Sequence, residues 1–144
     1  MGGQVSFVLL NLTSTAQFDC LKLVFSRSLC SDVGWVVGHS FSNYGPLIAG
    51  ATTLLYEGKP VGTPDAAQFW RLIERHRVKT LFTAPTGLRG IKRVDPQGEL
   101  VKKFDISSLE TLFVAGERAD TDTLKWAEDS TGVRIFCAPL SRSL

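Results

Sequence analysis

The chain has 144 residues, of which 16 are lysine or arginine and 14 are aspartate or glutamate. This length suits one ordinary domain with a hydrophobic core, and the near balance of charge gives no reason to expect nucleic acid as a partner. No apolar run approaches the roughly 20 residues of a membrane-spanning helix, so no transmembrane segment is expected. Cys20, Cys30 and Cys137 lack metal-site spacing, which favours free thiols in a reducing, intracellular compartment.

The N-terminal part of the chain offers weak local signals. Val5–Leu12 is apolar but lacks a preceding basic run, so it is a poor secretory signal. Residues 39–50 contain small residues suited to close packing and are expected to form a helix. His39 stands beside Ser40, but no acid partner or nucleophile elbow supports a hydrolytic pair, so a structural role is expected for this histidine.

Four short apolar or β-branched runs, bounded by Gly, Pro or Asp, are predicted to be strands. They are Thr52–Tyr56, Thr80–Phe82 together with Val78, Thr111–Ala115 and Val133–Cys137. An amphipathic stretch lies between each of these runs and the next. This alternation predicts an α/β fold, with a parallel sheet flanked by helices.

The first of these helices is expected to begin at Thr63, whose hydroxyl can cap it, with Pro64 in the first turn. Its inward face follows the helical spacing i, i+3, i+4 and i+7, at Phe69, Leu72, Ile73 and His76. A histidine near a helix C-terminus is mildly favoured as a cation, so His76 is expected to be structural.

Two more helices are predicted further along the chain. One follows Pro85 and ends before Asp95-Pro96, because proline disfavours a helical residue before it. The other starts near Asp120, turns Leu124, Trp126 and Ala127 inward, and stops at Thr131-Gly132 with a glycine terminator. The polar segment Gln97–Asp105 between them is expected to be a surface loop.

The most distinctive pattern is D-V-G-W-V-V-G-H-S-F-S-N-Y-G-P-L at 32–47, followed by G-A-T-T at 50–53 and Y-E-G at 56–58. F-T-A-P-T at 82–86 and L-F-V-A-G-E-R at 112–118 come next in order. Together these blocks resemble the AMP-forming short-chain acyl-CoA synthetases, and K-P-V-G-T-P-D at 59–65 resembles their propionyl-type branch. The resemblance covers about residues 31–133, which would be part of the large N-terminal domain of an adenylate-forming enzyme. None of these blocks falls in residues 1–30 or 134–144, which are expected to be a non-matching leader and tail.

The resemblance implies three groups of site residues. Gly116, Glu117 and Arg118 would line the adenine and ribose end of the ATP site. The acyl pocket and the route of CoA would be lined by Trp35, Val36, Val37 and Ala115. The active-site floor would be shaped by Thr83, Ala84, Pro85 and Thr86, although these hydroxyls could equally cap the next helix.

The family reaction joins a short-chain carboxylate, such as propionate or acetate, to CoA with ATP and Mg²⁺, releasing AMP and pyrophosphate. The family's phosphate loop T-S-G-T-T-G-x-P-K-G, its W-W-Q-T-E-T motif and its lysine-bearing C-terminal domain have no counterpart in these 144 residues. This chain alone is therefore expected to be inactive and to bind no cofactor tightly, with no residue here assigned to catalysis or to a metal. The alternatives are a truncated isoform that binds nucleotide weakly or pairs with a full-length relative, and a chain without a stable fold that self-associates. A mitochondrial or cytosolic location is expected.

Overall fold

The computed structural model of the chain describes residues 6–11, 28–30, 39–40, 44–48, 50–57, 61–62 and 64–137. Its elements along the chain are β1 (Ser6–Asn11), β2 (Ser28–Cys30), α2 (Gly45–Ile48), β3 (Thr52–Glu57), α3 (Gln68–His76), β4 (Thr80–Thr83), α4 (Pro85–Val94), a 3₁₀ helix (Val101–Lys103), β5 (Thr111–Val114), α5 (Thr121–Thr131) and β6 (Ile135–Cys137). The predicted strands and the three main helices are therefore confirmed, with strand ends shifted by one or two residues.

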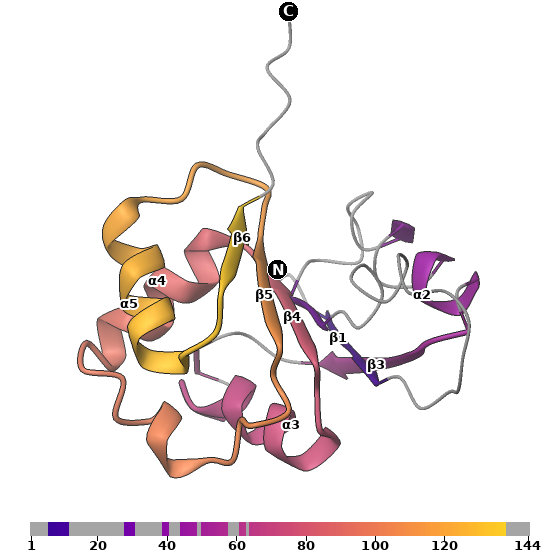
Figure 1. Cartoon of the computed structure of the whole chain (residues 1–144), viewed down its shortest axis with the longest axis horizontal. Helices are drawn as coiled ribbons and strands as arrows, with labels where there is room; N and C mark the ends of the chain where they lie inside the picture. The colour runs from indigo at the N-terminus through magenta and orange to yellow at the C-terminus, as the bar shows by residue number, and fades with distance from the viewer. Residues whose placement is uncertain are drawn as a thin grey trace, which may run out of the picture.

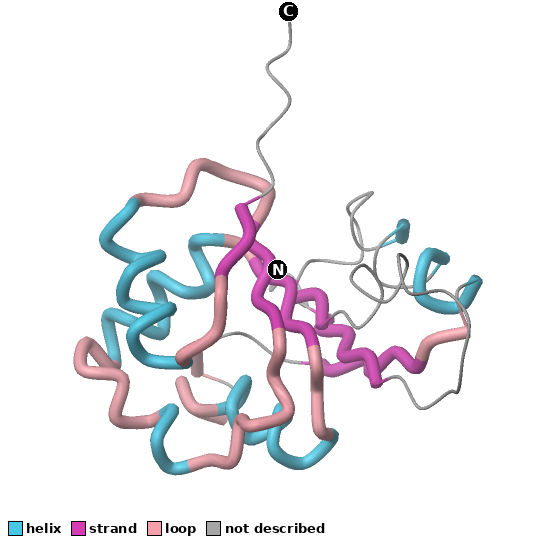
Figure 2. Tube along the Cα trace, viewed as in Figure 1, coloured by secondary structure: helices cyan, strands magenta, loops and turns pink. Residues whose placement is uncertain are grey.

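The six strands form one sheet in the order β3-β1-β2-β4-β5-β6 (Figures 1 and 2). The pairs β2–β4, β4–β5 and β5–β6 are parallel, as the alternation of strands and helices predicts. The pairs β1–β2 and β1–β3 are antiparallel. The apolar run near the N-terminus therefore serves as a strand between β2 and β3, which places β3 at the edge of the sheet among the described strands.

The main core lies between one face of the sheet and the helices α3, α4 and α5. Side chains alternate along β4 and β5, and the register places Leu81 beside Leu112 on this face. The helices contribute inward stripes at helical spacing. The side chains buried most completely in this core are Trp70, Ile73, Val78, Leu81, Leu88, Ile91, Leu112 and Val114.

The opposite face of the sheet carries a row of phenylalanines. The register pairs Phe82 with Phe113 and Phe113 with Phe136, across three neighbouring parallel strands. The rings of Phe113 and Phe136 are stacked, with centroids 5.4 Å apart, a favourable aromatic arrangement. Ala115 packs into the same small cluster, beside Phe82 and Phe113. This face is therefore apolar at the carboxyl end of β5.

Helix α3 begins at Gln68, so the prediction of a start at Thr63 with Pro64 in the first turn is wrong. The reason is a turn at Asp65, whose carboxylate accepts a hydrogen bond from the Ala67 amide at 2.9 Å. The Asp65 carbonyl also accepts from the Gln68 amide at 3.4 Å. This turn takes the place of the expected first helical turn. Thr63 itself lies outside the described residues.

The predicted helix over residues 39–50 is only partly described. An α-helix is assigned to Gly45–Ile48, and His39 and Ser40 are also helical. Residues 41–43 and 49 lie outside the described part of the chain. Tyr44, Leu47 and Ile48 are exposed.

The segment Gln97–Asp105 is not simply a surface loop. The buried carboxylate of Asp95 accepts hydrogen bonds from the amides of Glu99 at 2.9 Å and Leu100 at 2.7 Å. These bonds fold the chain after α4 and lead into the 3₁₀ helix, where Val101 is 2% exposed in the core. The inward position of Val101 was not predicted, because the residues around it in sequence are mostly polar.

Replacing Asp95 with alanine is therefore expected to lower the free energy of unfolding by about 1–3 kcal/mol, because two partly buried backbone amides lose a charged acceptor. Urea unfolding followed by circular dichroism measures this difference. Asp129→Ala is the matched control, since Asp129 is exposed and its carboxylate accepts no hydrogen bond from the described residues. Equal unfolding midpoints for the two variants would contradict the proposed role of Asp95.

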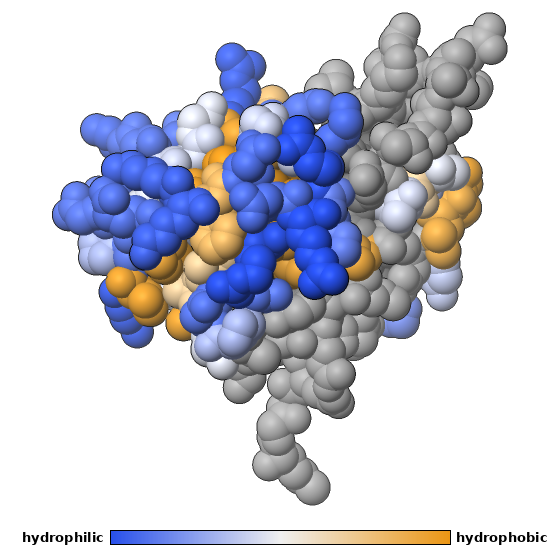
Figure 3. Space-filling view, turned by 90° about the horizontal axis from the view of Figure 1, so that it is seen from below, coloured by the Kyte–Doolittle hydropathy of each residue, from blue (hydrophilic) through white to orange (hydrophobic). Residues whose placement is uncertain are grey.

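Hydrophilic side chains cover most of the described surface seen in Figure 3, the face seen from below in the view of Figure 1. Exposed ion pairs include Arg77 with Asp105 at 2.7 Å and Lys79 with Glu110 at 2.6 Å. Exposed pairs of this kind stabilise by about 0–1 kcal/mol each, so the buried core decides stability. Among the described residues, no helix has the length and apolar character needed to cross a membrane.

Candidate functional site

The candidate site lies where β4 and β5 end. These strands are parallel neighbours with Thr83 paired to Val114, and the Ala115 amide donates to the Thr83 carbonyl at 3.2 Å. The loops that follow the two strands therefore start side by side. The carboxyl edge of an open parallel sheet is the usual place for a ligand.

The loop after β5 turns at Gly116, whose φ is +98°. This backbone conformation favours glycine, because a side chain would be strained there. A Cβ at this position would meet no described heavy atom within 4 Å. The backbone of Gly116 is thus open on the side where a side chain would otherwise project, which suits the approach of a flat ligand.

Glu117 joins this loop to the start of α4. Its Oε1 atom accepts a hydrogen bond from the Thr86 amide at 2.6 Å and another from the Thr86 hydroxyl. The first-turn amides of a helix have no partner within the helix, and a carboxylate there is also favoured by the helix dipole. Glu117 therefore caps α4 from a segment that is 31 residues away in sequence.

The predicted alternative role of the Thr83–Thr86 hydroxyls as caps of α4 is wrong. The N-cap residue is Ala84, and no side chain of this segment caps the helix. Pro85 occupies the first turn, where its missing N–H costs nothing. Thr83 is fully buried, and its hydroxyl makes a long contact of 3.5 Å with the Ala84 carbonyl. The capping oxygen comes from Glu117 instead.

Arg89 is a contact residue that the sequence reasoning missed. Its Nε donates to Asp120 Oδ2 at 3.1 Å, and its Nη2 donates to the Arg118 carbonyl at 3.2 Å. The same Nη2 lies 3.5 Å from Glu117 Oε1. The one available signal was spacing, since Arg89 is three residues after Thr86 and lies on the same side of the helix.

Asp120 anchors the far end of the loop. Its Oδ1 accepts from the Thr123 amide at 2.8 Å, which makes Asp120 the N-cap of α5. The predicted start of this helix near Asp120 is confirmed. Hydrogen bonds from Thr123, together with the Arg89 guanidinium, hold the pKa of Asp120 below its ordinary value. Asp120 therefore remains ionised at neutral pH and keeps its pair with Arg89.

The structure thus brings together two of the three predicted groups, Gly116–Arg118 and Thr83–Thr86. Ala115 lies between them in the chain but packs on the phenylalanine face. Trp35, Val36 and Val37 lie outside the described residues. These two groups supply the Glu117 carboxylate, the Arg118 guanidinium, the exposed Thr86 hydroxyl and the open backbone of Gly116, which are groups that can bind and orient a ligand.

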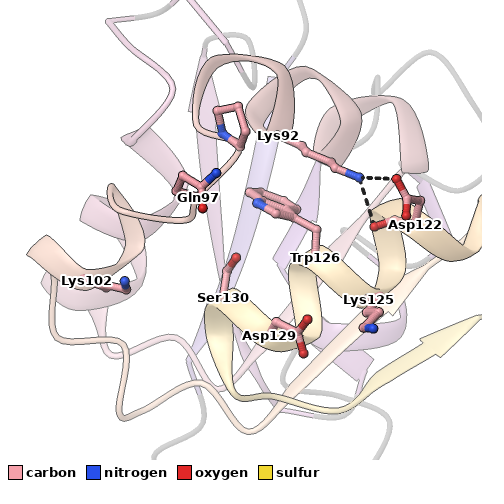
Figure 4. A pocket seen from close by; sticks show the side chains of 9 residues that line it. Lys92, Gln97, Lys102, Asp122, Lys125, Trp126, Asp129 and Ser130 are labelled. Carbon is pink, nitrogen blue, oxygen red and sulfur yellow. Dashed lines mark hydrogen bonds and ion pairs between the residues drawn. The ribbon is translucent and has the colours of Figure 1, made fainter.

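A separate cavity of about 480 Å³ lies between the C-terminal end of α4 and α5 (Figure 4). The Lys92 ammonium crosses part of it to the carbonyl and carboxylate of Asp122, at 3.0 and 3.1 Å. The indole of Trp126 lies among its lining residues, and its Nε1 has no hydrogen-bond partner among the described residues. None of the predicted site residues lines this cavity.

The comparisons with known proteins agree on one enzyme family. The family model for "AMP-binding enzyme" matches residues 9–138. An uncharacterized protein of Pseudomonas aeruginosa is 60% identical over 102 residues, covering 71% of this chain and 16% of that protein. The mouse mitochondrial acyl-CoA synthetase short-chain family member 3 is 56% identical over 110 residues, covering 76% and 15%.

Two further matches extend this result. A propionate–CoA ligase of Salmonella typhimurium is 43% identical over 106 residues, covering 74% of this chain and 16% of the ligase. The crystal structure of an acyl-CoA synthetase from Brucella canis superposes with a TM-score of 0.63 at 27% identity, covering 74% of this chain and 18% of that one. The chain thus spans about a sixth of the length of these relatives.

Proposed function

Because the chain belongs to the AMP-binding enzyme family, we propose that its described site forms the nucleoside side of the ATP site in a short-chain acyl-CoA synthetase. In this reaction a carboxylate oxygen attacks the α-phosphorus of ATP and pyrophosphate leaves. The CoA sulfur then attacks the acyl carbon and AMP leaves. The observation that supports the proposal is the junction of Glu117 with Thr86 at the carboxyl edge of β4 and β5.

The geometry fits a purine nucleoside at this junction. Gly116 presents open backbone on the side where a Cβ would project. All described contacts of Glu117 use Oε1, so its Oε2 is available to a ribose hydroxyl or an adenine amino group among the described residues. The Thr83–Thr86 segment would form the floor beside it.

The remaining roles are assigned by family resemblance. Trp35, Val36, Val37 and Ala115 would line the pocket for the acyl chain of propionate or acetate and the entrance for CoA. The apolar surroundings of Ala115 suit a short alkyl tail, since each buried methylene contributes about 0.8 kcal/mol. The described residues contain no cluster of His, Cys, Asp and Glu placed to hold Mg²⁺, so we derive no step through a metal. We propose a mitochondrial or cytosolic location.

The test is to graft residues 31–133 into the corresponding part of the Salmonella propionate–CoA ligase and to compare Glu117→Gln with the unmodified graft. Glutamine retains an oxygen that can accept from Thr86 but replaces the second oxygen with a donor. A hydrogen bond to a charged group contributes about 1.5–3 kcal/mol, so the KM for ATP is expected to rise about tenfold or more.

The KM for propionate serves as the internal control in this experiment and should stay unchanged. A shift in the KM for propionate with unaltered ATP kinetics would assign this tripeptide to the acid, and the proposal would be wrong. A second measurement uses the 144-residue chain itself. Titration with AMP should change the amide resonances of Thr86 and Gly116–Arg118, while propionate should not.

A further inference from the structure

We infer that Arg89 is a positioning residue that holds the Gly116–Asp120 loop in the shape that recognises a nucleoside. The identity of the ligand rests on the proposed function, whereas the contacts between Arg89 and the loop are independent of it. The guanidinium touches three successive parts of the loop: the Glu117 carboxylate, the Arg118 carbonyl and the Asp120 carboxylate. One side chain of α4 therefore spans the connection between β5 and α5.

The chemistry of the guanidinium explains why an arginine suits this position. Its planar fork presents several N–H donors in fixed directions, so it can bridge two carboxylates and a carbonyl at once. A lysine ammonium is a compact point charge that cannot reach all three acceptors. Loss of the fork would also leave the Glu117 and Asp120 carboxylates without the cation that lies between them.

The consequence for the site concerns the direction of Glu117. Three contacts, two from Thr86 and one from Arg89, all meet at Oε1. They hold that oxygen against α4 and leave Oε2 free of hydrogen bonds to the described residues. Arg89 thus fixes the carboxylate without occupying the oxygen that would accept from the ligand. It is expected to act through Glu117 and not to touch the nucleotide.

The first experiment measures amide hydrogen exchange in the 144-residue chain, for which Arg89→Lys is the test variant. The Thr86 amide, which donates to Glu117, and the Thr123 amide, which donates to Asp120, are both expected to exchange about tenfold faster. Arg93→Ala is the matched control, because Arg93 is one turn further along α4, is exposed, and its side chain makes no hydrogen bond or ion pair with the described residues. Unchanged exchange at Thr86 in Arg89→Lys, or equal acceleration in Arg93→Ala, would overturn the inference.

The second experiment separates positioning from general stability, in the grafted ligase described above. Arg89→Lys is expected to raise the KM for ATP about tenfold with the KM for propionate unchanged. A purely structural role would lower the active fraction, and hence the apparent kcat, without changing either KM, and that result would also overturn the inference. If the Glu117→Gln graft shows no ATP effect while Thr86 still exchanges faster in Arg89→Lys, the proposed nucleotide role fails and the loop contact stands.

Discussion

Replacing Trp70 with alanine is expected to lower the free energy of unfolding by about 3–5 kcal/mol. The Trp70 side chain is fully buried on α3, in the core shared with the sheet and the other two main helices. Its removal takes apolar area out of the core and leaves a cavity that rigid neighbours only partly fill. Domains are stable by about 5–15 kcal/mol in total, so this loss is a large fraction of the whole.

Urea unfolding followed by circular dichroism measures this change without relying on tryptophan fluorescence. Arg75→Ala is the matched control on the same helix, because Arg75 is exposed and surface substitutions usually change stability by less than about 0.5 kcal/mol. Trp70→Phe should cost much less than alanine. It fills most of the space, and it removes an Nε1–H that has no partner among the described residues. A Trp70→Ala midpoint equal to that of Arg75→Ala would show that this core does not support the fold.

The sequence predicts best those elements whose signals are local. The proline at each end fixed the bounds of α4, from Pro85 to Val94. Gly132, with a φ of +68°, ends α5 as expected. The predicted start of α3 was wrong because the turn at Asp65 competes with a helix N-cap over the same few residues. Local chemistry permits both structures there, and only the packed fold selects one.

The features that could not be predicted depend on contacts between distant residues. The pairing of β1 with β3 joins segments more than 40 residues apart, and an apolar run alone does not name its partner strand. Arg89 and Glu117 meet only because β4 and β5 are parallel neighbours. The sequence marked Glu117 and Thr86 as separate site residues through family resemblance. Nothing in the sequence indicated that the Glu117 carboxylate would cap α4, the helix that carries Thr86.

The 144 residues on their own are expected to form no propionyl-CoA, acetyl-CoA or butyryl-CoA from ATP, CoA and the free acid with Mg²⁺. The reaction develops negative charge around the α-phosphorus, and donors placed beforehand must stabilise it. The family's phosphate loop and its W-W-Q-T-E-T motif are not among the residues of this sequence. Loss of a single such donor costs about 2.7–4 kcal/mol, or about 10²–10³ in rate, so the loss of several should place turnover below detection.

The assay for thioester needs protein freed of host synthetases and a heat-inactivated sample as its baseline. The grafted ligase provides the positive control, because it contains residues 31–133 of this chain together with a complete phosphate site. If the graft turns over propionate and the isolated chain does not, the described residues can form the nucleoside-binding side of the ATP site but need the family's phosphate-binding residues for the reaction. Thioester formed by the isolated chain above the heated baseline would instead mean that the residues after β4 and β5 perform more of the reaction than binding and orientation. That outcome would require a new assignment of catalytic roles within this sequence.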